Sequence, residues 1–114
     1  MDDTSFFILR RWKASPRTVW RALTRPEERA HWLGSDGEHG VVHAEADERD
    51  AARYHMVMNG KNGEPPITVE LARAGDGAEF LLRQDGFADK LARDSAERAW
   101  KSRIRRLARH VDAT

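Results

Sequence analysis

The most regular hydrophobic pattern in the chain lies near its C-terminal end, between Ala88 and Val111. Apolar residues recur there at steps of three and four, which is typical of one face of an amphipathic helix. At 1.5 Å per residue, a helix of about 24 residues is roughly 36 Å long, so a sheet or other helices must cover its apolar face. The residues predicted on that face are Leu91, Ala99, Trp100, Ile104, Leu107, Ala108 and Val111.

The first third of the chain predicts one strand and two short helices. Ser5–Lys13 is rich in strand-forming residues, but both of its faces carry apolar side chains, so its inward face stays open. Ser15, followed by proline, is a typical helix N-cap. A second short helix begins at Thr24 or Arg25 and ends at Gly34, a residue suited to the left-handed backbone that follows many helices.

The middle of the chain predicts four strands separated by turn residues. Tyr54, Met56 and Met58 alternate with more polar neighbours, which predicts that these three side chains share one face. Asn59–Gly63 has the composition of a turn, and Ala74–Gly77 is predicted to be a hairpin turn between neighbouring strands. The four strands are Val41–Ala46, Ala52–Met58, Ile67–Ala72 and Ala78–Gln84.

Composition narrows the range of functions. The 114 residues predict a single domain over 1–114, and the apolar share of 39% is sufficient for a core. With 20 basic and 19 acidic residues the net charge is only +1, which argues against a nucleic-acid partner. The absence of cysteine excludes disulfides and thiol nucleophiles. The acidic N-terminus and short apolar run after it fit neither a signal peptide nor a membrane span, so we expect a cytoplasmic protein without membrane contact.

Two stretches of sequence resemble a known family. WKASPRTVWRALTRP at 12–26, followed by HWLG at 31–34, is similar to the opening signature of the START-like (SRPBCC) proteins related to the activator of Hsp90 ATPase. GF at 86–87, AW at 99–100 and LA at 107–108 resemble that family's close, except that the family usually has Gly at the position of Ala99. The resemblance implies an α+β helix-grip fold, in which an antiparallel sheet grips a long C-terminal helix and two short helices follow the first strand.

The middle of the chain departs from that family, whose members usually run about 25 to 40 residues longer. The resemblance therefore implies a shortened member that lacks a central hairpin. We expect a sheet of about five strands, in which 52–58 pairs directly with 67–72. The family's ligand cavity lies between the sheet and the long helix, so here it should be reduced or open on one side.

Few residues suggest catalysis or metal binding. His39 and His43 are four apart but lie outside a helix, so the spacing does not put them on one face, and a zinc site needs three or four convergent ligands. His55 is most simply a solvent-facing strand histidine rather than a general base. The chain shows no nucleophile motif, phosphate loop or His-Glu metal motif, so we expect no cofactor, no metal and no catalytic residue.

The second half of the long helix is basic, while Asp89, Asp94 and Glu97 lie in its first half. This arrangement complements the helix dipole, so a solvated face is the simplest interpretation and a docking surface for an acidic partner is the alternative. The basic residues are Arg98, Lys101, Arg103, Arg105, Arg106 and Arg109.

Large apolar residues mark the expected cleft between sheet and helix. They either surround a ligand or simply pack as core. The sequence therefore favours a non-catalytic binding module for a small apolar ligand or a protein partner. The alternatives are a chaperone-associated interaction protein and, with less support, an enzyme of the cyclase or hydrolase kind. The cleft candidates are Trp32, Tyr54, Met56, Met58, Val69, Phe80 and Trp100.

A missing hairpin also bears on assembly, because it leaves sheet edges and apolar surface uncovered. The candidate edges are Val41–Ala46 and Ser5–Lys13. We therefore expect a homodimer of two-fold symmetry. The alternative is a monomer whose large side chains fill the gap. The residues expected at the dimer contact include Phe7, Leu9, Tyr54 and Met58.

Overall fold

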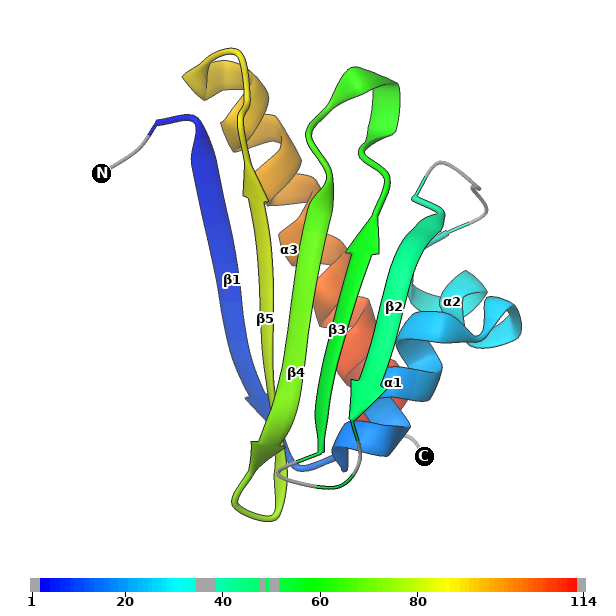
Figure 1. Ribbon diagram of the computed structural model, residues 1–114. Helices are drawn as coiled ribbons and strands as arrows, with labels where there is room; N and C mark the ends of the chain where they lie inside the picture. The colour runs from blue at the N-terminus through cyan, green and yellow to red at the C-terminus, as the bar shows by residue number, and fades with distance from the viewer. Residues whose placement is uncertain (1–2, 35–38, 48, 50–51, 113–114) are drawn as a thin grey trace.

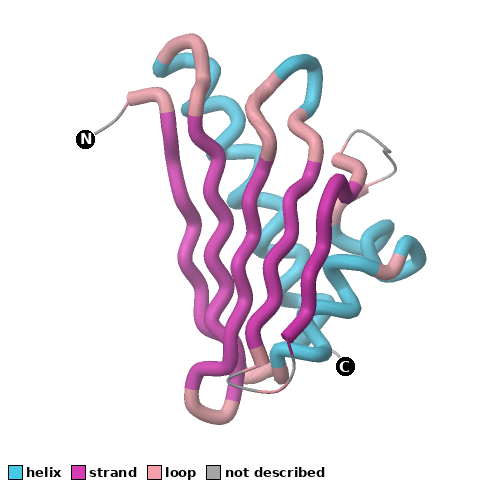
Figure 2. Tube along the Cα trace, viewed as in Figure 1, coloured by secondary structure: helices cyan, strands magenta, loops and turns pink. Residues whose placement is uncertain are grey.

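A computed structural model describes residues 3–34, 39–47, 49 and 52–112. It contains an antiparallel sheet of five strands in the order β1-β5-β4-β3-β2. A long C-terminal helix and two short helices lie together on one side of this sheet (Figure 1; Figure 2). The elements are β1 (Ser5–Trp12), α1 (Pro16–Thr24), α2 (Pro26–Trp32), β2 (Val41–Asp47), β3 (Arg53–Met58), the 3-10 turn η1 (Lys61–Gly63), β4 (Ile67–Ala74), β5 (Gly77–Asp85) and α3 (Lys90–Asp112).

The observed architecture is the α+β helix-grip arrangement that the sequence predicts. β3 pairs directly with β4, with Met56 opposite Val69, across the loop that contains η1. β1 pairs along its whole length with β5, so the first and last strands are neighbours in the sheet. β1 and β2 form the two edges, as predicted. The sheet therefore ends in one strand from the N-terminus and one from the segment after the short helices.

The structure decides which face of β1 turns inward. Phe6 and Ile8 are buried beneath the helices, whereas Phe7 is 64% and Leu9 46% exposed on the opposite face. The alternation within the strand is as expected, but the choice of face depends on where the helices lie. β1 consequently presents two large apolar side chains to solvent.

The apolar face of α3 differs from the predicted one. Leu91 is 77% exposed and Ala99 is also exposed, so both were wrongly placed on the buried face. Leu91 lies nine residues before Trp100, and at about 100° per residue that separation puts it on the opposite side of the helix. The buried residues are Ala96, Trp100, Ile104, Leu107 and Val111. None of the helices in the described ranges is long and apolar enough to cross a membrane.

The two short helices are capped as the sequence suggests and are tied to α3 through one tryptophan. The Ser15 hydroxyl accepts from the backbone N–H of Thr18 at the start of α1, and Arg25 is the N-cap of α2. Trp32 at the end of α2 donates its indole N–H to the carbonyl of Ala22, 2.7 Å away. Its own carbonyl accepts from Arg106 of α3. Trp32 therefore connects all three helices.

Candidate functional site

The seven predicted cleft residues all lie in the layer between the sheet and the helices. Each is at most 4% exposed. A water-sized cavity among these side chains would leave part of their surface accessible, so the side chains themselves fill this part of the layer. A ligand-lining role for them stays a prediction, and it requires the layer to open. They come from five elements: Trp32 from α2, Tyr54, Met56 and Met58 from β3, Val69 from β4, Phe80 from β5 and Trp100 from α3.

Two further tryptophans, which are not among the seven predicted cleft residues, also contribute to the packing of this layer. The ring of Trp12 stacks on Phe80 with centroids 5.1 Å apart. The ring of Trp20 lies 4.9 Å from that of Tyr54. Aromatic pairs at these distances contribute beyond the area they bury. Both tryptophans are only partly buried and pack against the buried core.

A hollow of about 230 Å³ opens beside Trp100, between α3 and the loop that joins β3 to β4. Its wall is mostly polar, in contrast to the apolar layer next to it. α3 supplies one side, the β3–β4 loop another, and His39, two residues before β2, a third. The lining residues are His39, Lys61, Glu64, Ser95, Ala96, Ala99, Trp100 and Arg103.

His39 is the most constrained of these residues. It is 1% exposed, and its Nδ1 lies 3.0 Å from the carbonyl oxygen of Asn59. Because that carbonyl only accepts, Nδ1 carries the proton and Nε2 is an acceptor in the neutral ring. Within the described part of the chain, Nε2 has no hydrogen-bond partner. A buried acceptor of this kind calls for a functional or structural explanation.

The surroundings hold the His39 ring in place. Arg29 of α2 donates to the His39 carbonyl, and the N–H of Asn59 donates to the carbonyl of Gly40 at 2.9 Å. The ring stands edge-on to Trp100, with centroids 5.0 Å apart. No local pattern in the sequence predicts this burial, because His39 belongs to a loop and its environment comes from α2, α3 and the β3–β4 loop.

Charged side chains of both signs are among the described residues that line the hollow. Lys61 and Arg103 provide two cations, and Glu64 provides one carboxylate. The guanidinium of Arg103 lies 4.8 Å from the Trp100 ring centroid, a cation–π distance. Arg103 of the basic face therefore packs on Trp100 and lines the hollow.

The histidines of β2 and β3 lie elsewhere. His43 Nε2 lies 2.8 Å from a Glu45 carboxylate oxygen, and His55 Nδ1 lies 3.7 Å from one of Glu70. These pairs are on the outward side of β2, β3 and β4, away from the hollow beside Trp100. Among the residues the structure describes, no group of three or more His, Asp or Glu side chains is placed to hold a metal ion.

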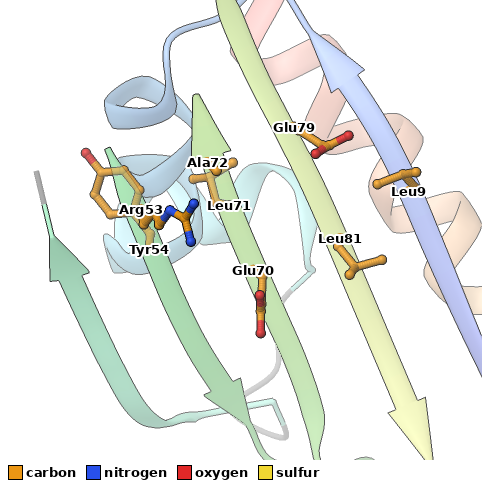
Figure 3. A pocket seen from close by; sticks show the side chains of 8 residues that line it. All are labelled: Leu9, Arg53, Tyr54, Glu70, Leu71, Ala72, Glu79 and Leu81. Atoms are coloured by element: carbon orange, nitrogen blue, oxygen red, sulfur yellow. The ribbon is translucent and has the colours of Figure 1, made fainter. Parts of the chain in front are cut away.

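The outer face of the sheet has a second, shallower hollow of about 170 Å³ (Figure 3). Leu9 of β1 lies opposite Leu81 of β5 in the strand register, and Arg11 pairs with Glu79 at 3.2 Å. The predicted dimer contact needs a correction here, because Tyr54 and Met58 are buried on the inner face and only the β1 residues are exposed. The labelled lining residues are Leu9, Arg53, Tyr54, Glu70, Leu71, Ala72, Glu79 and Leu81.

Comparison with known proteins places the fold. The sequence matches no family model and no curated protein. Among solved structures, a Mesorhizobium loti protein aligns over 96% of this chain and 98% of its own, with a TM-score of 0.67 and 21% identity. A Staphylococcus aureus protein of unknown function aligns over 96% and 93%, with a TM-score of 0.56 and 15% identity.

The solution structure of the Aha1 dimer from Colwellia psychrerythraea is also similar. It covers 94% of this chain and 95% of its own, with a TM-score of 0.65 and 11% identity. At these identities the likeness concerns the fold. Together with the five-stranded antiparallel sheet and the C-terminal helix, it confirms the predicted resemblance at that level. The chain therefore has the START-like helix-grip fold of the Aha1-related proteins.

Proposed function

We propose that this protein is a non-catalytic binding module that takes a small ligand between α3 and the β3–β4 loop, beside Trp100. The observation that carries this proposal is the hollow of about 230 Å³, whose wall includes a buried histidine acceptor and two basic side chains. Small-molecule sites are typically concave, with a few well-placed polar groups. Trp100 belongs both to this wall and to the apolar layer behind it.

In this proposal, an apolar part of the ligand enters the layer between sheet and helix beside Trp100, which belongs to both. Met56 and Met58 lie in that layer, and methionine side chains adapt readily to a new neighbour. A ligand whose apolar part enters must displace side chains that are now closely packed. Binding of this kind is therefore expected to favour ligands with a polar part that stays in the hollow.

Thermal-shift measurements with a metabolite library test the proposal, because a ligand that binds only the native state raises the melting temperature. The variant Ala99→Phe fills the hollow from its exposed wall and should abolish the shift. Ala30→Phe changes another exposed helical alanine, on α2, and should leave the shift intact. If no compound stabilises the protein, or if Ala99→Phe binds as well as the unmodified chain, the proposed site is wrong.

A homodimer formed through β1 is the second candidate, and the exposure of Phe7 and Leu9 favours it. β1 is an edge strand, and an edge with apolar side chains is prone to pair with another chain. A protein of the same fold is described as a dimer. Light scattering at micromolar concentration should give about twice the 13.0 kDa chain mass, and Phe7→Lys should restore the monomer. A mass that stays at 13.0 kDa on concentration would end the dimer proposal.

A further inference from the structure

We infer that the solvent-facing side of α3 is a docking surface for an acidic helix of another protein. The surface consists of Leu91, Arg98, Arg105 and Arg109, and we call it the arginine stripe. All four side chains are exposed, and Leu91 is 77% exposed. None of them lines the hollow beside Trp100, so the stripe is separate from the proposed ligand site.

The residues of the arginine stripe lie in line on the side of α3 opposite the sheet. At about 100° per residue, Leu91, Arg105 and Arg109 each lie about 20° from the direction of Arg98. Trp100, which is buried, lies about 200° from that direction. At about 1.5 Å per residue, the axial spacing is about 10.5 Å from Arg98 to Arg105 and about 6 Å from Arg105 to Arg109. α3 packs on one face of the sheet (Figure 1), which leaves the stripe open to a partner.

The positive charge of the stripe is not neutralised within the part of the chain that the structure describes. Two acids on the same helix are paired with other cations, because Asp94 lies 2.5 Å from Arg93 and Glu97 lies 3.2 Å from Lys101. Among the salt bridges of the described residues, none includes an arginine of the stripe. A partner carboxylate can therefore reach these guanidinium groups without first breaking an ion pair.

The helix dipole accounts for only one of the three arginines. Cations near the C-terminus stabilise a helix, but this effect falls off within the last turn. α3 ends at Asp112, so Arg109 lies in the last turn. Arg105 lies about two turns and Arg98 about four turns before that end. The charges of Arg98 and Arg105 therefore point to a partner rather than to the stability of the helix itself.

The spacing of the stripe selects the shape of the partner. Arginine and carboxylate pair through two parallel hydrogen bonds, so the partner needs acids about 10.5 and 6 Å apart on one face. Acids seven and four residues apart on an α-helix satisfy both spacings. In a strand, at about 3.3 Å per residue, 10.5 Å is about three residues, and side chains three residues apart point to opposite faces. An antiparallel helix also places its acids toward its own N-terminus, where the dipole favours negative charge.

Other occupants fit the stripe less well. A helix that binds a membrane surface inserts a broad apolar face, whereas the stripe has one large apolar side chain, Leu91. The net charge of +1 lacks the basic excess that is typical of nucleic-acid binders. Two copies of the stripe would bring arginines against arginines, so a second copy of this chain is repelled. These observations favour an acidic protein helix.

Fluorescence anisotropy with labelled, alanine-based helical peptides tests the inference on the unmodified protein. The matched peptide carries three glutamates with gaps of four and seven residues, and a leucine seven residues beyond the third. The control peptide has the same composition, but its glutamates are five residues apart and so lie about 140° apart around the helix. We expect the matched peptide to bind at least about threefold more tightly, and high salt to weaken it. Equal affinities, or no binding of the matched peptide at millimolar concentration, would overturn the inference.

Variants locate the binding surface. The stripe variant replaces the three arginines with glutamine (Arg98→Gln, Arg105→Gln and Arg109→Gln). It should weaken the matched peptide by about tenfold or more, because three ion pairs are lost together. The control variant removes the same charge from exposed arginines of the sheet, namely Arg53→Gln, Arg73→Gln and Arg83→Gln. The control variant should bind as the unmodified chain does; if it loses as much affinity, binding follows the overall charge and the inference is wrong.

Leu91→Ala tests the orientation of the partner. It should weaken the matched peptide about two- to threefold, and it should have no effect on a peptide whose leucine is replaced by alanine. An equal loss for both peptides would show that Leu91 does not face the leucine of an antiparallel partner and would overturn the inference.

Vesicles that contain phosphatidylserine test the membrane alternative. We expect them not to bind the protein at the salt concentration at which the matched peptide binds. If the vesicles bind, the stripe variant abolishes that binding and the matched peptide does not bind, the stripe recognises a lipid surface and the inference is wrong.

Discussion

Truncation of Trp100 to alanine is the most direct test of how α3 is held against the sheet. Trp100 is 1% exposed, at the middle of the buried stripe that runs from Ala96 to Val111. Its ring also contacts the edge of His39 and the guanidinium of Arg103. Trp100→Ala therefore removes the largest side chain on the buried face of the helix and one wall of the hollow.

The expected loss of unfolding free energy is about 3–5 kcal/mol. A tryptophan buries roughly 150–250 Å², and at about 25 cal/mol per Å² this amounts to about 4–6 kcal/mol. That figure is an upper bound, because alanine keeps part of the contact and the unfolded chain is already partly compact. Water entering the space from the adjoining hollow moves the result toward the lower end of the range observed for aromatic truncations.

Urea unfolding followed by far-UV circular dichroism measures this loss. Leu91→Ala is the matched control, since Leu91 lies on the same helix and is 77% exposed, so its truncation should change stability by less than about 0.5 kcal/mol. A loss below about 1 kcal/mol for Trp100→Ala would show that α3 does not pack as described. A large loss for Leu91→Ala would show that the helix is rotated from its observed orientation.

Three further outcomes are expected. Ser15→Ala removes the acceptor of the Thr18 N–H and should lower unfolding free energy by about 1 kcal/mol in urea unfolding; no loss would mean that water replaces the cap. Gly34→Ala should lower the unfolding free energy by about 1–2 kcal/mol in the same measurement, because φ is 101° at this position and an alanine is strained there. No atom crowds the added methyl group, so crowding adds nothing to this loss. Dialysis against a chelator should leave the melting temperature unchanged, and a drop would point to metal binding by the histidines.

The order and type of the elements could be predicted from sequence because both follow from local chain geometry. Alternation at 54–58 placed Tyr54, Met56 and Met58 on one face, and the structure buries all three. Ser15 and Gly34 marked helix ends through conformational preferences that need no tertiary contact. The direct pairing of β3 with β4 was expected from the family resemblance, which implied that a central hairpin is missing, and the strand register confirms it.

The site beside Trp100 was decided by tertiary structure. Trp100 could be predicted as buried because it lies on a periodic stripe, whereas His39, Lys61 and Arg103 come from a loop, a 3-10 turn and a helix face with no shared periodicity. Leu91 was placed on the wrong face because an apolar pattern with steps of three and four residues shifts gradually around the helix. Only the position of the sheet shows which apolar face of the helix is covered. Sequence periodicity thus determined which faces are apolar. The packing of α2, α3 and the β3–β4 loop decided which polar groups meet, because those contacts join residues far apart in the chain.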